Sequence, residues 1–191
     1  MITKHLEPAR MCGVQVEFFG EAFAKECGFG AGDSIEALVG SIGGEIRYRD
    51  ILASEQALTD ASLVIEAPRR FRIILPNHTT HARDRLEIAK ELGRYFLLFL
   101  LPYLQACPQD HEPFQSIRLE RYPDRETQQQ CNQFAAAFLM PAGVFKEASD
   151  RFGGNTQALA DHFGVPGTTV FHRQVGLGLI QRDRPQAMRP H

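Results

Sequence analysis

Residues 83 to 98 constrain the fold more than any other stretch of the chain. Placed at roughly 100° per residue, Arg83, Glu87, Lys90, Glu91 and Arg94 fall in one narrow arc of a helix, and apolar residues fill most of the remaining circumference. A helix that is apolar over so much of its surface is mostly buried. We therefore expect its single charged stripe to face a cleft or a partner element.

The signs of charge alternate along this stripe. Glu87 with Lys90, and Glu91 with Arg94, are spaced i,i+3 and are predicted to form two ion pairs. One interpretation is an ordinary helix face with salt bridges, each worth about 0.2–0.5 kcal/mol. The other is a repurposed pocket, for example one that binds an anion.

Two segments carry a resemblance to a known family. Residues 89–98 begin Ala-Lys-Glu-Leu-Gly-Arg, and residues 131–141 read Cys-Asn-Gln-Phe-Ala-Ala-Ala-Phe-Leu-Met-Pro. They resemble the Ala-His-Glu-Leu-Gly-His helix and the Ala-Asn-x-Phe-Ala-Ala…Met-Pro helix of the ImmA/IrrE family of zinc metallopeptidases. The resemblance spans about residues 34 to 180. It implies an α+β fold, with a small twisted sheet packed on a zincin-like central helix and a helical C-terminal part that contains a helix-turn-helix.

The zinc ligands of that family are missing here. In the family, two histidines spaced i,i+4 bind zinc, and the adjacent glutamate acts as general base for a metal-bound water. This chain has Lys90 and Arg94 at the histidine positions, and neither side chain offers zinc a lone pair near neutral pH. The third ligand position is occupied by Gln128, and Glu126 lies roughly 200° away around the same helix.

The resemblance therefore implies a degenerate member without a metal or other cofactor. Its candidate binding cleft is formed by the former metal-site positions and their charged neighbours, with Glu91 as the catalytic residue only if activity remains. These residues are Glu87, Lys90, Glu91, Arg94, Glu126 and Gln128.

We predict four parts along the chain. They are an N-terminal helix and lead-in at 1–33, an ImmA/IrrE-like metallopeptidase-like domain at 34–152, a helix-turn-helix-like unit at 153–181 and a disordered tail at 182–191. Asp33 or Ser34 is expected to cap a short helix, and residues 61–66 and 71–76 are expected to form paired strands. Residues 102–125 are interpreted as a loop with little regular structure. Within it, residues 117–122 fit either a short strand or a helical turn.

Composition limits the setting of the protein. The net charge is −2 and the charges are mixed along the chain, so the composition does not indicate a basic nucleic-acid surface. A local basic patch is compatible with this composition. Four spread cysteines without a C-x-x-C pair indicate free thiols in a reducing cytoplasm. The longest apolar run, 95–104, is about half of a membrane span, so no membrane association is expected.

Three functions follow as hypotheses. The first is a non-catalytic regulatory protein that binds a protein partner, such as a repressor-like transcription regulator of a phage, a mobile element or a stress response. The second is an active zinc endopeptidase that cleaves a repressor, with ligands drawn from Glu91, Glu126, His78 and His81. The third is a DNA-binding regulator that acts through residues 156–180, with His172 and Arg173 as contacts.

Overall fold

The computed structural model describes residues 11–49, 61–77, 79–106, 114–119, 122 and 124–181. The first helix, α1 (Gly13–Glu26), is followed by the short helix α2 (Ile35–Ser41). Ser34 caps α2, since its hydroxyl accepts a hydrogen bond from the Ala37 N–H at 3.1 Å. This confirms the predicted cap. The predicted tail at 182–191 lies outside the described residues.

A four-stranded sheet follows, with the order β1-β3-β2-β4. Its strands are β1 (Gly44–Arg49), β2 (Ser62–Ala67), β3 (Arg70–Pro76) and β4 (Ile117–Leu119). β1 pairs with β3 in parallel, while β2 is antiparallel to both β3 and β4. The paired strands at 61–66 and 71–76 are thus confirmed, and of the two alternatives left open at 117–122 the structure forms the short strand, β4.

The central helix is longer and less regular than predicted. α3 (His81–Arg94) continues into a π-helical segment, η2 (Tyr95–Leu100), and then into α4 (Leu101–Gln105). Pro102 lacks an N–H, and in a regular α-helix its ring would clash with the carbonyl four residues earlier. The wider turns of the π-helix directly before it allow the chain to continue past the proline.

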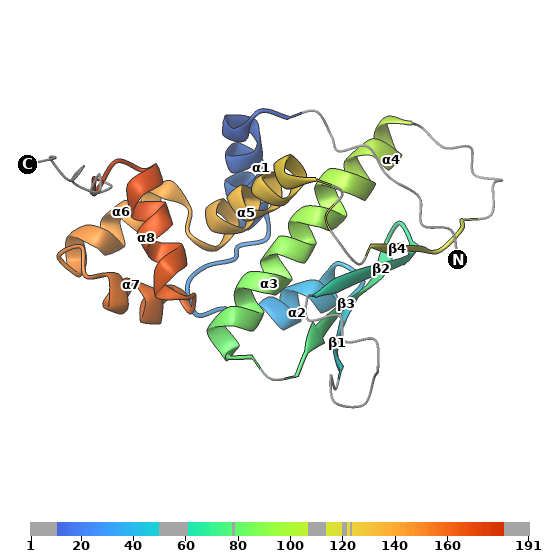
Figure 1. The fold of residues 1–191 in the computed structure, drawn as a ribbon, viewed down its shortest axis with the longest axis horizontal. Coiled ribbons are helices and arrows are strands. Elements are labelled where there is room, and N and C mark those ends of the chain that lie inside the picture. Colours follow the sequence, from blue (N-terminus) through green and yellow to red (C-terminus); the bar gives the residue numbers. More distant parts are fainter. Residues whose placement is uncertain are drawn as a thin grey trace, which may run out of the picture.

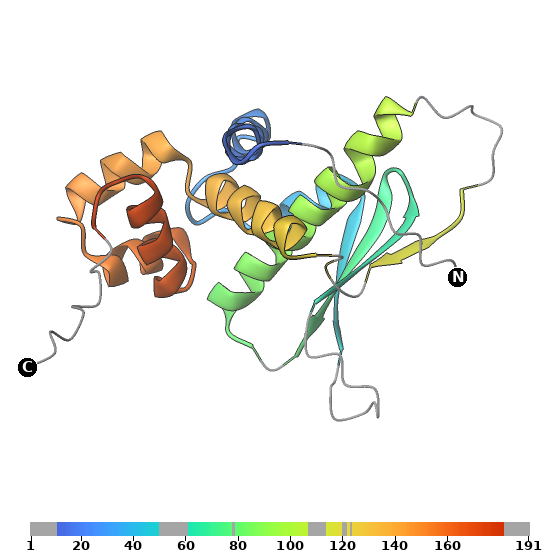
Figure 2. The same ribbon diagram turned by 45° about the horizontal axis from the view of Figure 1, so that its top comes forward.

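Two further helices pack beside this long helix. α5 (Arg125–Leu139) lies between α1 and α3 (Figures 1 and 2). The three helices share a cluster of aromatic rings, which includes Phe19, Phe23, Phe96 and Phe134. Gly20 lets α1 and α5 approach closely, because a Cβ there would lie 2.8 Å from the Phe134 carbonyl oxygen.

The C-terminal part is helical, as predicted. It contains α6 (Ala142–Arg151), α7 (Thr156–Phe163) and α8 (Gly167–Gly176). Gly164 ends α7 with a φ of +63°, which is the left-handed conformation that glycine adopts easily. This unit lies at the opposite end of the molecule from the sheet (Figure 1). Together these elements confirm the predicted α+β class.

Within the described ranges, no helix combines the length and the apolar character needed to cross a membrane.

Candidate functional site

A cleft of about 670 Å³ runs along the charged stripe of α3, between the sheet and the start of α5. Its lining residues are Ala61, Leu75, Pro76, Thr79, Arg83, Asp84, Glu87, Lys90, Glu91, Arg94, Tyr122, Asp124, Arg125 and Gln128. The expectation that the stripe faces a cleft is therefore met. Asp124 also caps α5, because its carboxylate accepts the Thr127 N–H at 2.7 Å.

The floor of the cleft holds a fully buried ion pair. The side chains of Glu91 and Arg94 are each only 1% exposed, and Arg94 Nη1 lies 3.2 Å from Glu91 Oε2. The same nitrogen donates to the Leu119 carbonyl oxygen of β4 at 3.0 Å. The guanidinium carbon lies 4.0 Å from the centroid of the Tyr122 ring, which is cation–π geometry. Arg94 is thus held by a neighbour on its own helix, by β4 and by Tyr122.

A second set of charges lies nearer the cleft mouth. Glu87 Oε2 contacts Lys90 Nζ at 2.8 Å, and Glu87 Oε1 contacts Arg83 Nη2 at 2.9 Å. Both predicted i,i+3 pairs therefore form. Because Glu87 and Lys90 are more than four-fifths buried, these charges are less well hydrated than those of an ordinary helix surface.

The buried Glu91 carboxylate influences two neighbouring acids. Burial raises the pKa of the Cys131 thiol to about 12, and Glu91 adds to this rise. Burial, again reinforced by Glu91, raises the pKa of the Tyr122 hydroxyl above its ordinary value. Both groups are consequently neutral near pH 7.

The chemistry of the donors at the former metal-site positions does not fit zinc. Lys90 is ion-paired, Arg94 offers only N–H donors, and the third position carries the amide of Gln128. Glu91, which would serve as general base, has its carboxylate against the Arg94 guanidinium. Among the residues that the structure describes, no three His, Cys, Asp or Glu side chains are grouped to hold a metal ion.

The structure brings most of the predicted site residues together. Glu87, Lys90, Glu91, Arg94 and Gln128 all line the cleft. Glu126 does not line it; it is exposed in the first turn of α5, because its position two residues before Gln128 turns it to another side of the helix.

The histidines considered as rearranged ligands do not complete a site. His81 is exposed at the start of α3 and does not line the cleft, while His78 lies outside the described residues.

Tyr122 and Arg125 were missed by the sequence analysis. Tyr122 falls in a segment without periodicity, and only the fold places it over Arg94. Arg125 is the first residue of α5 and follows the capping Asp124. The one sequence signal that could have placed Arg125 is Asp124, an N-cap residue that predicts the start of a helix.

A second groove, of about 740 Å³, lies on the other side of the charged stripe, between α3, α5 and α8. It shares Arg83, Glu87 and Lys90 with the cleft. Its remaining wall is mostly polar and is formed by Glu17, Leu86, Gln129, Asn132, Gln133, Ala136, Thr168, Thr169, His172, Arg173, Val175 and Gly176.

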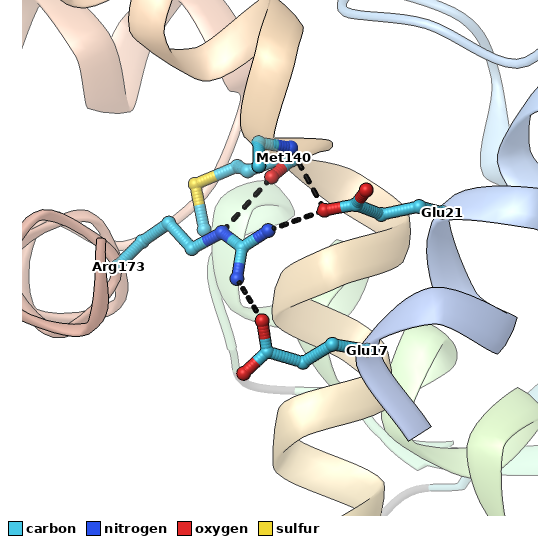
Figure 3. Close-up of polar contacts among 5 residues, drawn as sticks. Glu17, Glu21, Met140 and Arg173 are labelled. Carbon is cyan, nitrogen blue, oxygen red and sulfur yellow. Dashed lines mark hydrogen bonds and ion pairs between the residues drawn. The ribbon is translucent and has the colours of Figure 1, made fainter. Parts of the chain in front are cut away.

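Arg173 in this groove is committed to internal contacts (Figure 3). Its Nε donates to the Met140 carbonyl oxygen at 3.0 Å, and its terminal nitrogens contact Glu17 and Glu21 at 3.0 and 2.9 Å. The residue is 5% exposed. The DNA contact predicted for Arg173 is not supported, because two carboxylates and a carbonyl already occupy its guanidinium. His172 is exposed beside it.

Comparisons with known proteins agree with this geometry. Residues 50–174 match the model of the peptidase M78 family, described as the IrrE N-terminal-like domain. A solved structure described as a Mycobacterium tuberculosis transcriptional regulator is similar at 20% sequence identity with a TM-score of 0.57. That similarity covers 90% of this chain and 57% of the other chain, and it shows the fold. The search of curated proteins found no match.

Proposed function

Because the chain belongs to the IrrE N-terminal-like domain family, we propose that it is a regulatory protein that keeps the scaffold of these metallopeptidases without their catalysis. It binds a protein partner through the cleft along α3. The partner that we propose is a repressor-like or other transcription regulator of a phage, a mobile element or a stress response, in the cytoplasm.

One observation carries this proposal, namely the buried pair of Glu91 and Arg94. A general base must have a carboxylate oxygen free to take a proton from water. Here the glutamate at that position lies 3.2 Å from a guanidinium, and both side chains are almost fully buried. Such a pair supports a structural role for Glu91 rather than a catalytic one.

The charges of the cleft favour a polypeptide over a simple anion. Its lining carries four cationic side chains and four carboxylates, so their formal charges cancel. The cations are Arg83, Lys90, Arg94 and Arg125, and the carboxylates are Asp84, Glu87, Glu91 and Asp124. A cleft with donors and acceptors in balance suits a polar peptide segment, which also presents both kinds of group.

The first experiment is elemental analysis of the purified, untagged protein beside a Lys90→His, Arg94→His, Gln128→Glu variant. We expect no zinc in the natural protein and about one zinc per chain in the triple variant, because it restores three ligands. A Lys90→His, Gln128→Glu variant is the matched control and should stay metal-free, since Arg94 remains. About one zinc per chain in the natural protein would overturn the proposal and restore the hypothesis of an active peptidase.

The second experiment tests the partner directly. Arg83 and Arg125 are exposed at the cleft, so an Arg83→Glu, Arg125→Glu variant reverses charge there with little disturbance of the core. In pull-downs with purified repressor-like regulators of the same genome, we expect this variant to lose binding. A Lys146→Glu, Arg151→Glu variant carries the same charge change on α6 and should bind normally. Equal binding by both variants would exclude the cleft as the docking site.

A further inference from the structure

The face of the sheet turned away from α3 carries an unusual number of arginines. Residues alternate between the two faces of a strand, and the inward set includes Phe71, Ile73 and Leu75 of β3. The strand register aligns Glu45, Arg72, Val64 and Arg118 in one row across the opposite face. We call this outer surface the arginine face.

Apart from Pro76, which ends β3 and lines the cleft, ten strand positions lie on the arginine face, and Ser62 and Val64 among them are buried. The ten are Glu45, Arg47 and Arg49 of β1, Arg70, Arg72 and Ile74 of β3, Ser62, Val64 and Glu66 of β2, and Arg118 of β4. Five of the ten are arginine and two are glutamate, so the formal net charge of the ten side chains is +3. The whole chain has a net charge of −2, so positive charge is concentrated on this face.

Three of these arginines are held by the two glutamates, and two of the three are well exposed. Glu45 contacts Arg47 at 2.9 Å and Arg72 at 3.8 Å, and Glu66 contacts Arg70 at 3.1 Å and also Arg72. The side chains of Arg47 and Arg70 are nevertheless 58% and 73% exposed. Their guanidinium groups are therefore oriented by the sheet while still open to a partner.

The chemistry of this face matches phosphate groups. The guanidinium fork pairs with phosphate oxygens in a bidentate manner, and it is less strongly hydrated than an ammonium group. None of the ten positions carries an aromatic ring on which a base could stack. The apolar side chains are only Val64 and Ile74, and Val64 is 7% exposed, so a large apolar anchor for a protein partner is missing.

We propose that the arginine face binds the phosphodiester backbone of duplex DNA, without readout of base sequence. It lies on the side of the sheet turned away from α3 (Figure 1), whereas the cleft runs along α3. This proposal does not depend on the proposed function, because the arginine face shares none of its ten residues with the lining of the cleft.

The test is fluorescence anisotropy of a labelled 20-base-pair duplex titrated with the full chain at several salt concentrations. We expect the logarithm of the association constant to fall with the logarithm of salt concentration with a slope of about −2.7 to −4.5, as for three to five phosphate contacts. An Arg47→Glu, Arg70→Glu variant should bind at least about tenfold more weakly. A Lys146→Glu, Arg151→Glu variant, with the same charge change on α6, should bind as the natural protein does.

A gain of binding provides a check that does not depend on loss of structure. Glu45→Gln removes a negative charge that neutralises Arg47 and Arg72, and this variant should bind the duplex several-fold more tightly. Absence of duplex binding at low salt, or equal weakening by both charge-reversal variants, would overturn the proposal. Tighter binding of polyglutamate than of the duplex would also overturn it and would identify an acidic polypeptide as the partner.

Discussion

At the scale of single residues, the burial of Arg94 has a large energetic consequence. A guanidinium is always charged, so taking it out of water is costly unless its donors find acceptors. Glu91 and the Leu119 carbonyl supply acceptors, and the Tyr122 ring covers the cation. Such a pair adds little net stability compared with apolar packing, but removal of one partner leaves the other charge buried alone.

We therefore expect Arg94→Met to destabilise the fold by about 3–5 kcal/mol, because it removes the cation that lies against the buried Glu91 carboxylate. Urea denaturation followed by circular dichroism measures this change. A Glu91→Leu, Arg94→Met variant should recover most of the loss, since both charges are gone. The exposed Arg151→Ala change should stay within about 0.5 kcal/mol. A single variant as stable as the natural protein would show that the pair is not buried in solution.

Cys131 gives a prediction that depends on pH. Its pKa rises to about 12 in the fold because burial disfavours the thiolate, while the value in an unfolded chain is about 8.5. Between these two values the unfolded chain loses the proton and the folded chain keeps it, so the stability contribution, complete below pH 8.5, is lost as pH rises towards 12. Tyr122 contributes in the same direction.

The free energy of unfolding should accordingly fall more steeply between pH 9 and 11 in the natural protein than in Cys131→Ala. Iodoacetamide labelling at pH 8, read by mass spectrometry, should modify the exposed Cys12 in the native state and reach Cys131 only in urea. Rapid native labelling of Cys131, or identical pH slopes for the two proteins, would contradict this account.

The sequence predicted those parts of the site that depend on local spacing. The pairs of Glu87 with Lys90 and of Glu91 with Arg94 follow from helical geometry alone, and both are present. Tyr122 over Arg94 could not be predicted, because their contact depends on how a segment without periodicity crosses the cleft.

At the scale of elements, α1 and α5 approach each other closely at Gly20. A methyl group there would meet the Phe134 carbonyl oxygen at 2.8 Å, and a backbone atom cannot turn aside as a flexible side chain can. The two helices would have to separate to admit it, and the aromatic cluster that they share with α3 would loosen.

Gly20→Ala is consequently expected to cost about 1–3 kcal/mol, despite the higher helix propensity of alanine. Gly40→Ala on α2 is the matched control, because nothing lies within 4 Å of its added methyl group. That change should be neutral or stabilise the protein by up to about 0.5 kcal/mol. Thermal denaturation of the two variants should therefore give shifts in Tm of opposite sign, or a loss for Gly20→Ala alone. An unchanged Tm for Gly20→Ala would refute the close approach.

Element types were easier to predict than their irregularities. The helices and the central strand pair follow from periodicity, caps and glycines. The edge strand β4 is only three residues long, so the local sequence left a short strand and a helical turn as alternatives, and pairing with β2 decides between them. The arginine face escaped prediction for a similar reason, since Arg47, Arg72 and Arg118 become neighbours only through the strand register.

At the scale of the whole molecule, one continuous apolar core runs from the sheet to the C-terminal helices. It includes Leu63 and Ile73 in the sheet, Phe134 in α5, and Phe163 and Val170 in α7 and α8. The predicted boundary at residue 152 is therefore not expected to separate two independent folding units. Arg173 adds polar contacts from α8 to α1 and to the end of α5.

Arg173→Ala should weaken this connection selectively. We expect backbone amides of residues 156–176 to exchange hydrogen faster in the variant, while amides of the sheet exchange at nearly unchanged rates. Hydrogen-exchange mass spectrometry measures both regions in one experiment. His172→Ala changes the exposed neighbour and should leave exchange unaltered. If Arg173→Ala gave no local change, the core alone would hold the C-terminal helices in place.

The π-helical segment at Tyr95–Leu100 also has a meaning for the history of the chain. Each of its wide turns holds about one residue more than an α-helical turn, so it is the structural mark that a single inserted codon would leave in a helix. The charged residues before it keep their orientation whatever follows, and everything after it is rotated. Relatives without this irregularity should show a one-residue gap here when their sequences are aligned, with the cleft-lining positions upstream still in register.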